Sequence, residues 1–133
     1  MKAVFLDTVG LLATWNESDQ WHGLAFPVYQ KILRDRRLVA TTTGVLLECG
    51  NAAARLACRD DLLALKERLE RNKLLIPIED ADWRTAWLAY ERAGRGSAGI
   101  VDQISFTVMR RLGITDAFTN DQHFRTAGFT PLF

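Results

Sequence analysis

The stretch AFTNDQHF, residues 117–124, begins as a short apolar run and ends in polar residues. Runs of this kind are typical of strands that are buried on both faces. A second run, AVFLD at residues 3–7, has the same form and also ends in an acid. Buried strands that end in carboxylates therefore mark both ends of this chain, and each carboxylate needs a physical reason.

Strand-like and helix-like segments alternate along the rest of the chain. After AVFLD, the expected strands are LVATTT (38–43), LLIPI (74–78), AFT (117–119) and a last short one within AGFTPLF (127–133). The expected helices fall within residues 11–19, 22–36, 44–58, 60–72, 79–94 and 100–113. This alternation predicts an α/β fold with a mostly parallel sheet of about four or five strands and helices on both faces.

Single residues suggest where these elements lie or end. Pro77 cannot donate a ladder hydrogen bond, so LLIPI is expected at an edge of the sheet. Gly94 and Gly113 are expected to close the helices that precede them. Asp60 or Asp61 is expected to cap the helix over residues 60–72.

Length and composition limit the class of protein. The 133 residues, 48% of them hydrophobic, fit a single domain over residues 1–133. The net charge of +1 argues against a strongly basic nucleic-acid coat. Cys49 and Cys58 are too few for a disulfide framework and are expected to be small buried residues. The first residues are too short an apolar run, and too interrupted by acids, to be expected as a signal peptide, and no apolar run approaches about 20 residues. We therefore expect a soluble, cytoplasmic protein without a membrane span.

Four acids stand out by their surroundings. Asp7 and Asp121 follow two of the expected strands, and sites in parallel sheets form beyond the carboxyl ends of the strands. Glu48 lies in the apolar stretch VLLECGNAAA, and Asp102 lies in GIVDQISFTVM. A buried carboxylate is costly unless it is paired or bound to a metal.

Each acid also has an ordinary structural interpretation. Asp7 would cap a turn, Glu48 would be solvated, Asp102 would favour the helix dipole, and Asp121 would cap a turn before Phe124. Taken together, however, the four acids converge on one sheet edge from separate segments, and collected carboxylates need a cation. Hard oxygen ligands favour Mg²⁺ or Mn²⁺, which suits attack by water on a phosphodiester.

Histidine and tryptophan give weaker signals. His123 is a candidate general base or metal ligand, but a histidine two residues past an acid is more often structural, so it stays outside the predicted ligand set. Trp83 and Trp87 lie four residues apart on one expected helix. Packing against a core or a partner is favoured for them over base stacking.

Several motifs together resemble the PIN domain. They are Asp7 with Thr8 after AVFL, Glu48 in TTTGVLLECGNA, Asp102 and Ser105 in VDQISFTVMRRLGI, and the stretch AFTNDQHFRTAGF. The resemblance is to VapC-type ribonuclease toxins of prokaryotic toxin–antitoxin pairs and their stand-alone relatives. It runs nearly end to end, and residues 101–129 are its most specific part.

The resemblance implies a three-layer α/β sandwich and an Mg²⁺- or Mn²⁺-dependent endoribonuclease. It implies that the metal ligands are Asp7, Glu48, Asp102 and Asp121, with the hydroxyl neighbours Thr8, Ser105 and Thr119. Arginines at the rim would hold the RNA backbone, with Arg95, Arg110 and Arg125 as the candidates. The resemblance also implies a homodimer and a small antitoxin that inserts near the active site.

The chain departs from the family pattern at two positions. Val9 replaces a small or hydroxyl residue, which would remove one water-mediated contact to the metal. Gly99 stands where the family often has a serine helix cap. Val9 also argues against a haloacid-dehalogenase-like phosphatase, which would need an aspartate there. A PIN-fold module that binds RNA or a protein with little catalysis is the alternative function, and an enzyme acting on structured DNA ranks last.

Overall fold

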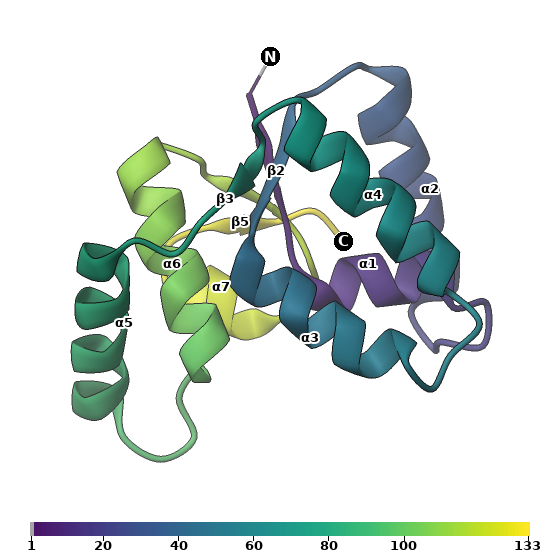
Figure 1. Cartoon of the computed structure of the whole chain (residues 1–133). Helices are drawn as coiled ribbons and strands as arrows, with labels where there is room; N and C mark the ends of the chain where they lie inside the picture. Colours follow the sequence, from purple (N-terminus) through teal and green to yellow (C-terminus); the bar gives the residue numbers. More distant parts are fainter. Residues whose placement is uncertain (1) are drawn as a thin grey trace.

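Five short strands form one sheet in the computed structural model, which describes residues 2–133 (Figure 1). They are β1 (Val4–Leu6), β2 (Val39–Thr42), β3 (Leu75–Ile76), β4 (Asp116–Phe118) and β5 (Thr130–Pro131). Their order is β3-β2-β1-β4-β5, and all four neighbouring pairs are parallel. All residues of β1 and β2 are buried, because these two strands and β4 are the inner strands.

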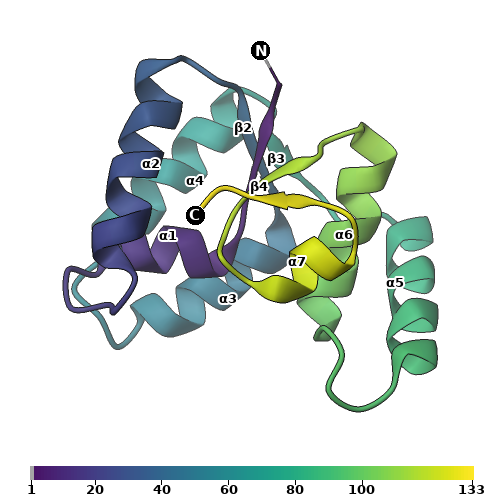
Figure 2. The same ribbon diagram turned by 180° about the vertical axis from the view of Figure 1, so that it is seen from behind.

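Seven helices surround this sheet within the described residues. They are α1 (Thr8–Trp15), α2 (His22–Arg34), α3 (Thr43–Ala53), α4 (Arg59–Arg71), α5 (Asp80–Ala93), α6 (Ile100–Leu112) and α7 (Gln122–Thr126). Figures 1 and 2 show α1 to α4 together on one side of the sheet and α5 to α7 on the other. Right-handed crossovers require this division, because the chain moves across the sheet in one direction through β1, β2 and β3 and returns to β4 and β5. The three-layer parallel fold is therefore confirmed.

Glycine decides how closely α1 approaches the sheet. The helix begins at Thr8, directly after β1, and not at residue 11 as the sequence suggested. A Cβ atom at Gly10 would lie 2.2 Å from the backbone oxygen of Phe118 at the end of β4. Only glycine allows this approach, which brings the start of α1 beside the end of β4.

Several expected element boundaries are confirmed, but α3 ends at Ala53 and not at residue 58, and the short helix α7 was not expected. β3 lies at an edge of the sheet and stops before Pro77. Gly94 and Gly113 follow α5 and α6, and Gly113 adopts the left-handed conformation with φ of 70°. The expected cap of α4 is wrong: the helix begins one residue earlier, after Cys58, and Asp60 and Asp61 lie in its first turn. Acids in a first turn still favour the helix dipole.

The remaining sequence expectations have mixed outcomes. Cys49 and Cys58 are both buried and free, as expected. Trp83 and Trp87 do not pack into the core: they are exposed on α5, where they contact each other edge-to-face. The partner that would cover them stays a prediction. No helix within residues 2–133 has the length and apolar character needed to cross a bilayer.

An ion pair between a buried aspartate and an exposed arginine holds the α5–α6 hairpin together. The carboxylate of Asp82, only 2% exposed, accepts hydrogen bonds from Arg111 Nε at 3.0 Å and from Arg111 Nη2 at 2.8 Å. It also accepts the backbone N–H of Glu79 at 3.1 Å. This two-point contact ties the start of α5 to the last turn of α6. The hairpin thereby sets the position of α6, which carries Asp102.

Gly10→Ala should lower the free energy of unfolding by about 1–3 kcal/mol, because the new methyl group meets backbone that cannot rotate away. Gly23→Ala on α2 is the matched control, since a Cβ there meets nothing within 4 Å. The control should raise the free energy of unfolding by up to about 1 kcal/mol. Urea unfolding of both variants measures the difference, and equal stability would refute the close-approach interpretation.

Candidate metal centre

Two neighbouring strand ends bring the first pair of acids together. Asp7 follows β1 and Asp121 lies three residues beyond the end of β4, and these two strands pair in register, with Leu6 opposite Phe118. Because parallel strands end at the same edge, both carboxylates lie at that edge. Asp102 comes from the first turn of α6, and Glu48 comes from the middle of α3.

Thr119 connects the two strand-end acids. Its hydroxyl donates to Asp7 Oδ2 at 2.8 Å and accepts the backbone N–H of Asp121 at 3.1 Å. Asp7 is 2% exposed, and its side chain does not cap α1 although the residue stands before that helix. The buried Thr119 therefore orients a carboxylate that the alternative of a simple turn cap does not explain.

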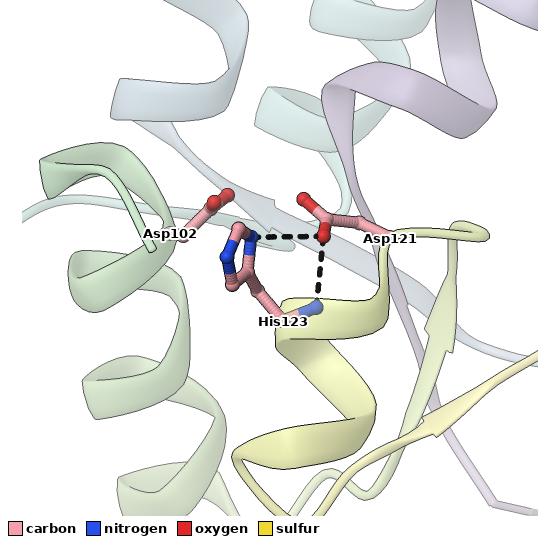
Figure 3. A group of neighbouring side chains, drawn as sticks. All are labelled: Asp102, Asp121 and His123. Carbon is pink, nitrogen blue, oxygen red and sulfur yellow. Dashed lines mark hydrogen bonds and ion pairs between the residues drawn. The ribbon is translucent and has the colours of Figure 1, made fainter. Parts of the chain in front are cut away.

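Asp121 performs the structural role expected of it and also faces the other acids. Its Oδ1 accepts the backbone N–H of His123 at 2.8 Å and so caps the short helix α7. The same oxygen lies 3.1 Å from His123 Nδ1. Figure 3 shows the imidazole between the carboxylates of Asp121 and Asp102. One ligand atom from each of these three residues lies within 4.8 Å of the other two.

Glu48 lies at the rim of this group. It is exposed, and its Oε1 accepts a hydrogen bond from the Thr8 hydroxyl at 2.7 Å, which ties α3 to α1. Glu48 does not belong to the three-residue group, but its charge helps to raise the pKa of Asp102. Asp7 does not belong to the three-residue group either, although the charges of Asp102 and Asp121 act on its pKa. Of the four predicted acids, the structure thus brings Asp102 and Asp121 within ligand distance of each other, with Asp7 buried nearby and Glu48 at the rim.

The pKa values show how strongly these acids affect one another. Burial, together with the charges of Asp102 and Asp121, raises the pKa of Asp7 to about 7, against hydrogen bonds from Thr119 and the backbone of Thr8 that lower it. Burial likewise raises the pKa of Asp102 to about 6, together with the charges of Asp121 and Glu48. His123 and the backbone N–H of Gly99 act in the opposite direction. Mutual repulsion of this kind is relieved by a bound cation.

The remaining predicted site residues have separate positions. Ser105 is buried, but its hydroxyl donates to the Val101 carbonyl at 2.9 Å within α6. Arg110 donates to the Ala127 carbonyl at 3.0 Å and lies over the Phe129 ring, so it packs α6 against the C-terminal segment. Arg95, in the α5–α6 loop, and Arg125, on α7, are both exposed. Their functional roles stay predictions.

The donor set fits a divalent metal ion. It offers carboxylate oxygens from separate elements and one imidazole nitrogen, and the oxygens suit Mg²⁺ or Mn²⁺. The sequence alone does not place His123 in the predicted ligand set. Its position two residues after a strand-end acid was the available signal, but only the tertiary fold brings it beside Asp102.

The raised pKa of Asp7 predicts a pH dependence for the metal-free protein. The carboxyl titrates near 3.8 in the unfolded chain and near 7 in the folded one, so between these values only the folded state keeps the proton. The free energy of unfolding therefore falls as the pH rises through this window. Asparagine does not ionise, so Asp7→Asn should not show this fall in the free energy of unfolding. Near pH 8 the variant should therefore be more stable than the unchanged chain by about 1–3 kcal/mol.

Urea unfolding in EDTA across this pH range measures the effect. Below about pH 4 the two proteins should be equally stable, because Asp7 is then neutral in both states. Glu67→Gln, an exposed acid on α4, is the control and should leave the pH profile unchanged. A profile that Asp7→Asn does not alter would contradict the predicted cost of ionising this carboxyl.

Comparisons with known proteins place this chain in a family. The PIN domain model matches residues 4–130. The chain is 31% identical over 131 residues to the 23S rRNA-specific endonuclease VapC20 of two Mycobacterium tuberculosis strains, with 95% of each chain covered.

Solved structures agree with this match. The crystal structure of Mycobacterium tuberculosis VapC20, described as a toxin that cleaves the sarcin–ricin loop, has a TM-score of 0.77 and 26% identity, with 96% of each chain covered. The crystal structure of FitAcB from Neisseria gonorrhoeae shares the fold, with a TM-score of 0.61, 18% identity, and 98% of this chain and 96% of that one covered. The acids described above thus lie at the sheet edge of a chain that belongs to the PIN domain family and is similar to the VapC-type endonuclease toxins.

Proposed function

We propose that this chain is a divalent-metal-dependent endoribonuclease and the toxin of a toxin–antitoxin pair. The observation that carries this proposal is the convergence of Asp7, Asp102 and Asp121, from three separate segments, with pKa values of about 7 and about 6 for the first two. Carboxylates gathered only for a structural role would gain no stability from repelling one another. The similarity to a 23S rRNA-specific endonuclease supports RNA as the substrate class.

Asp7, Glu48, Asp102 and Asp121 would hold Mg²⁺ or Mn²⁺. A bound divalent ion lowers the pKa of water and offsets charge on the phosphate in the transition state. The protein orients the ligands: Thr119 fixes Asp7, and Thr8 holds the carboxylate of Glu48 by the hydrogen bond at 2.7 Å. Asp7 lies deepest, so it would be the acid whose charge depends most on the ion.

Ser105 fits a supporting role less directly. Its hydroxyl proton is engaged with the carbonyl of Val101, so only its oxygen lone pairs remain for a water molecule in the site. Val9 is half-buried beside Thr8 and offers no hydrogen bond, and Gly99 stands before α6 without a side-chain cap. We expect Val9 and Gly99, the two positions that differ from the family pattern, to lower the rate of cleavage and not to abolish it.

A structured ribosomal RNA is the first substrate to test, because the name of the similar VapC20 specifies 23S rRNA. Exposed arginines near the site would contact the phosphate backbone. Arg95 and Arg125 suit this role, since both side chains are exposed and both flank His123, on the α5–α6 loop and on α7. Arg110 suits it less, since it is engaged with the carbonyl of Ala127.

A toxin of this class would act in the cytoplasm as a homodimer held in check by a small antitoxin. The exposed side chains of Trp83, Trp87, Leu88 and Tyr90 on α5 support at least one protein partner. A second copy or the antitoxin would cover them. Analytical ultracentrifugation and co-expression with an adjacent open reading frame distinguish the two.

Asp7→Asn and Asp102→Asn should each lower RNA cleavage at least about 100-fold, because each removes a ligand charge from the centre. The assay is cleavage of purified 23S rRNA and of a mixed labelled RNA pool with Mg²⁺, with Mn²⁺ and with EDTA. Both variants should remain folded by circular dichroism.

Glu67→Gln is the matched control, since it removes an exposed carboxylate outside the site and should cleave normally. Normal cleavage by either aspartate variant would reject these ligands. A folded wild-type chain that binds RNA but cleaves neither substrate with any metal would favour the non-catalytic binding module.

Replacing Arg95 and Arg125 together by glutamine should raise KM several-fold with little change in kcat, because these contacts would bind RNA without touching the reacting phosphate. The dependence of KM on salt should also become weaker, since fewer counterions are released. Steady-state cleavage at several salt concentrations measures both effects.

The control for this pair is Arg71→Gln, in the last turn of α4. This turn precedes β3, so it lies near the amino ends of the strands, whereas Asp7 and Asp121 follow the carboxyl ends. It should alter neither KM nor its salt dependence. An equal effect of the control and the double variant would show that the arginines act only through net charge.

A further inference from the structure

We infer that His123 is itself a ligand of the metal and shifts the preference of the centre from Mg²⁺ towards first-row transition ions such as Mn²⁺. The four-acid set does not include this imidazole. The inference rests on the proposed function in one respect, namely that a divalent ion occupies the site. It assigns a residue and a metal preference that the four acids do not specify.

The first support is the position of the ring. One atom each from Asp102, Asp121 and His123 lie within 4.8 Å of one another. Ligands of a six-coordinate ion at about 2.1 Å are about 3 Å apart when adjacent and about 4.2 Å apart when opposite. His123 Nδ1 and Asp121 Oδ1 are 3.1 Å apart, which is the spacing of adjacent ligands. Small side-chain rotations are therefore enough to close all three on one ion.

The second support is the hydrogen bond on the far side of the ring. His123 Nε2 lies 3.3 Å from the Gly96 carbonyl, in the loop between α5 and α6. A carbonyl oxygen only accepts, so Nε2 carries the proton in this contact. Metal-binding histidines usually donate their second N–H to such a group, which fixes the ring and directs the other nitrogen at the metal. In His123 that other nitrogen is Nδ1, the atom that lies 3.1 Å from Asp121 Oδ1.

The third support is the short distance between His123 Nδ1 and Asp121 Oδ1, which face each other at 3.1 Å. An ion bound between these two atoms would contact both and would also lie near the carboxylate of Asp102 (Figure 3). A direct ion pair between His123 and Asp121 is the alternative arrangement, and a spectroscopic test with Mn²⁺ distinguishes the two.

The metal preference follows from the chemistry of the donors. Mg²⁺ selects oxygen ligands and keeps its waters, whereas first-row transition ions gain affinity from an imidazole nitrogen. Three or four carboxylates alone would suit Mg²⁺. Adding one imidazole makes a mixed site, in which Mn²⁺ retains the oxygen ligands and also accepts the nitrogen.

The experiment uses the metal-free full chain and Mn²⁺ alone as the probe, so no RNA is needed. Pulsed electron paramagnetic resonance of the Mn²⁺ complex should detect the ¹⁴N coupling of a bound imidazole. His123→Asn should abolish this coupling, and His22→Asn should retain it. His22 is the matched control, because it is the other of the two histidines and its Nδ1 is hydrogen-bonded to the Ala13 carbonyl at 2.8 Å.

Calorimetric titration with each ion gives the second readout. The ratio of the Mg²⁺ and Mn²⁺ dissociation constants should fall about tenfold in His123→Asn. His123→Asp, which restores a ligand but makes the site all-oxygen, should bind Mg²⁺ at least as tightly as the unchanged chain and lose the preference for Mn²⁺. Thermal melting checks that each variant is folded, and the aspartate variant keeps the test decisive if the asparagine variant is not.

The outcomes separate this inference from the proposed function. If Mn²⁺ binds but shows no ¹⁴N coupling, or if neither variant changes the ion preference, His123 is only an ion-pair partner of Asp121 and the inference is overturned. Metal-dependent RNA cleavage would leave the proposed function standing in that case. If the unchanged chain binds neither ion, both fail together.

Discussion

The parallel pairing of β1 with β4 is the constraint on which the rest of this structure depends. It aligns Leu6 with Phe118 and so ends both strands at the same edge of the sheet. The close approach of Gly10 to the backbone of Phe118 then seats α1 against that edge. Asp7 and Asp121 are neighbours only because these backbone contacts exist, since the two residues lie at opposite ends of the chain.

Ordering these acids has a cost in stability. Asp7 is almost fully buried, and its ionised form gains only the hydroxyl of Thr119 and the backbone N–H of Thr8 as compensation. A structural role would favour a neutral residue of the same shape, whereas a metal site needs the charge. The raised pKa values of Asp7 and Asp102 are therefore the cost that the proposed metal site would offset.

The α5–α6 hairpin contributes to the site from the other face of the sheet. The ion pair between Arg111 and the buried Asp82 fixes the two helices against each other. Asp102 on α6 and the Gly96 carbonyl in the connecting loop are carried by the same unit, and both lie beside His123. A shift of this hairpin would move one carboxylate and the contact that orients the imidazole together. A partner protein that bound the exposed aromatic side chains on α5 would contact the same hairpin directly.

The sequence by itself determined the alternation of strands and helices and predicted the acids of the candidate site. Apolar runs that end in acids predicted the inner strands, and Gly94, Gly113 and Pro77 marked helix ends and an edge strand, because these signals are local backbone preferences. Asp7, Glu48, Asp102 and Asp121 followed from strand ends, unexpected charges in apolar stretches and the family resemblance. Such features do not depend on how distant segments pack.

Only the tertiary structure decided which side chains meet. It brought His123 beside Asp102 and put Glu48 at the rim. In the folded chain the Ser105 hydroxyl donates to the Val101 carbonyl within α6, and Arg110 donates to the Ala127 carbonyl in the C-terminal segment. The start of α4 differs from the prediction because the helix follows Cys58 without a side-chain cap, and Asp60 and Asp61 fall in its first turn. Contacts between residues far apart in sequence depend on distances of a few ångströms, which only the packed helices and sheet specify.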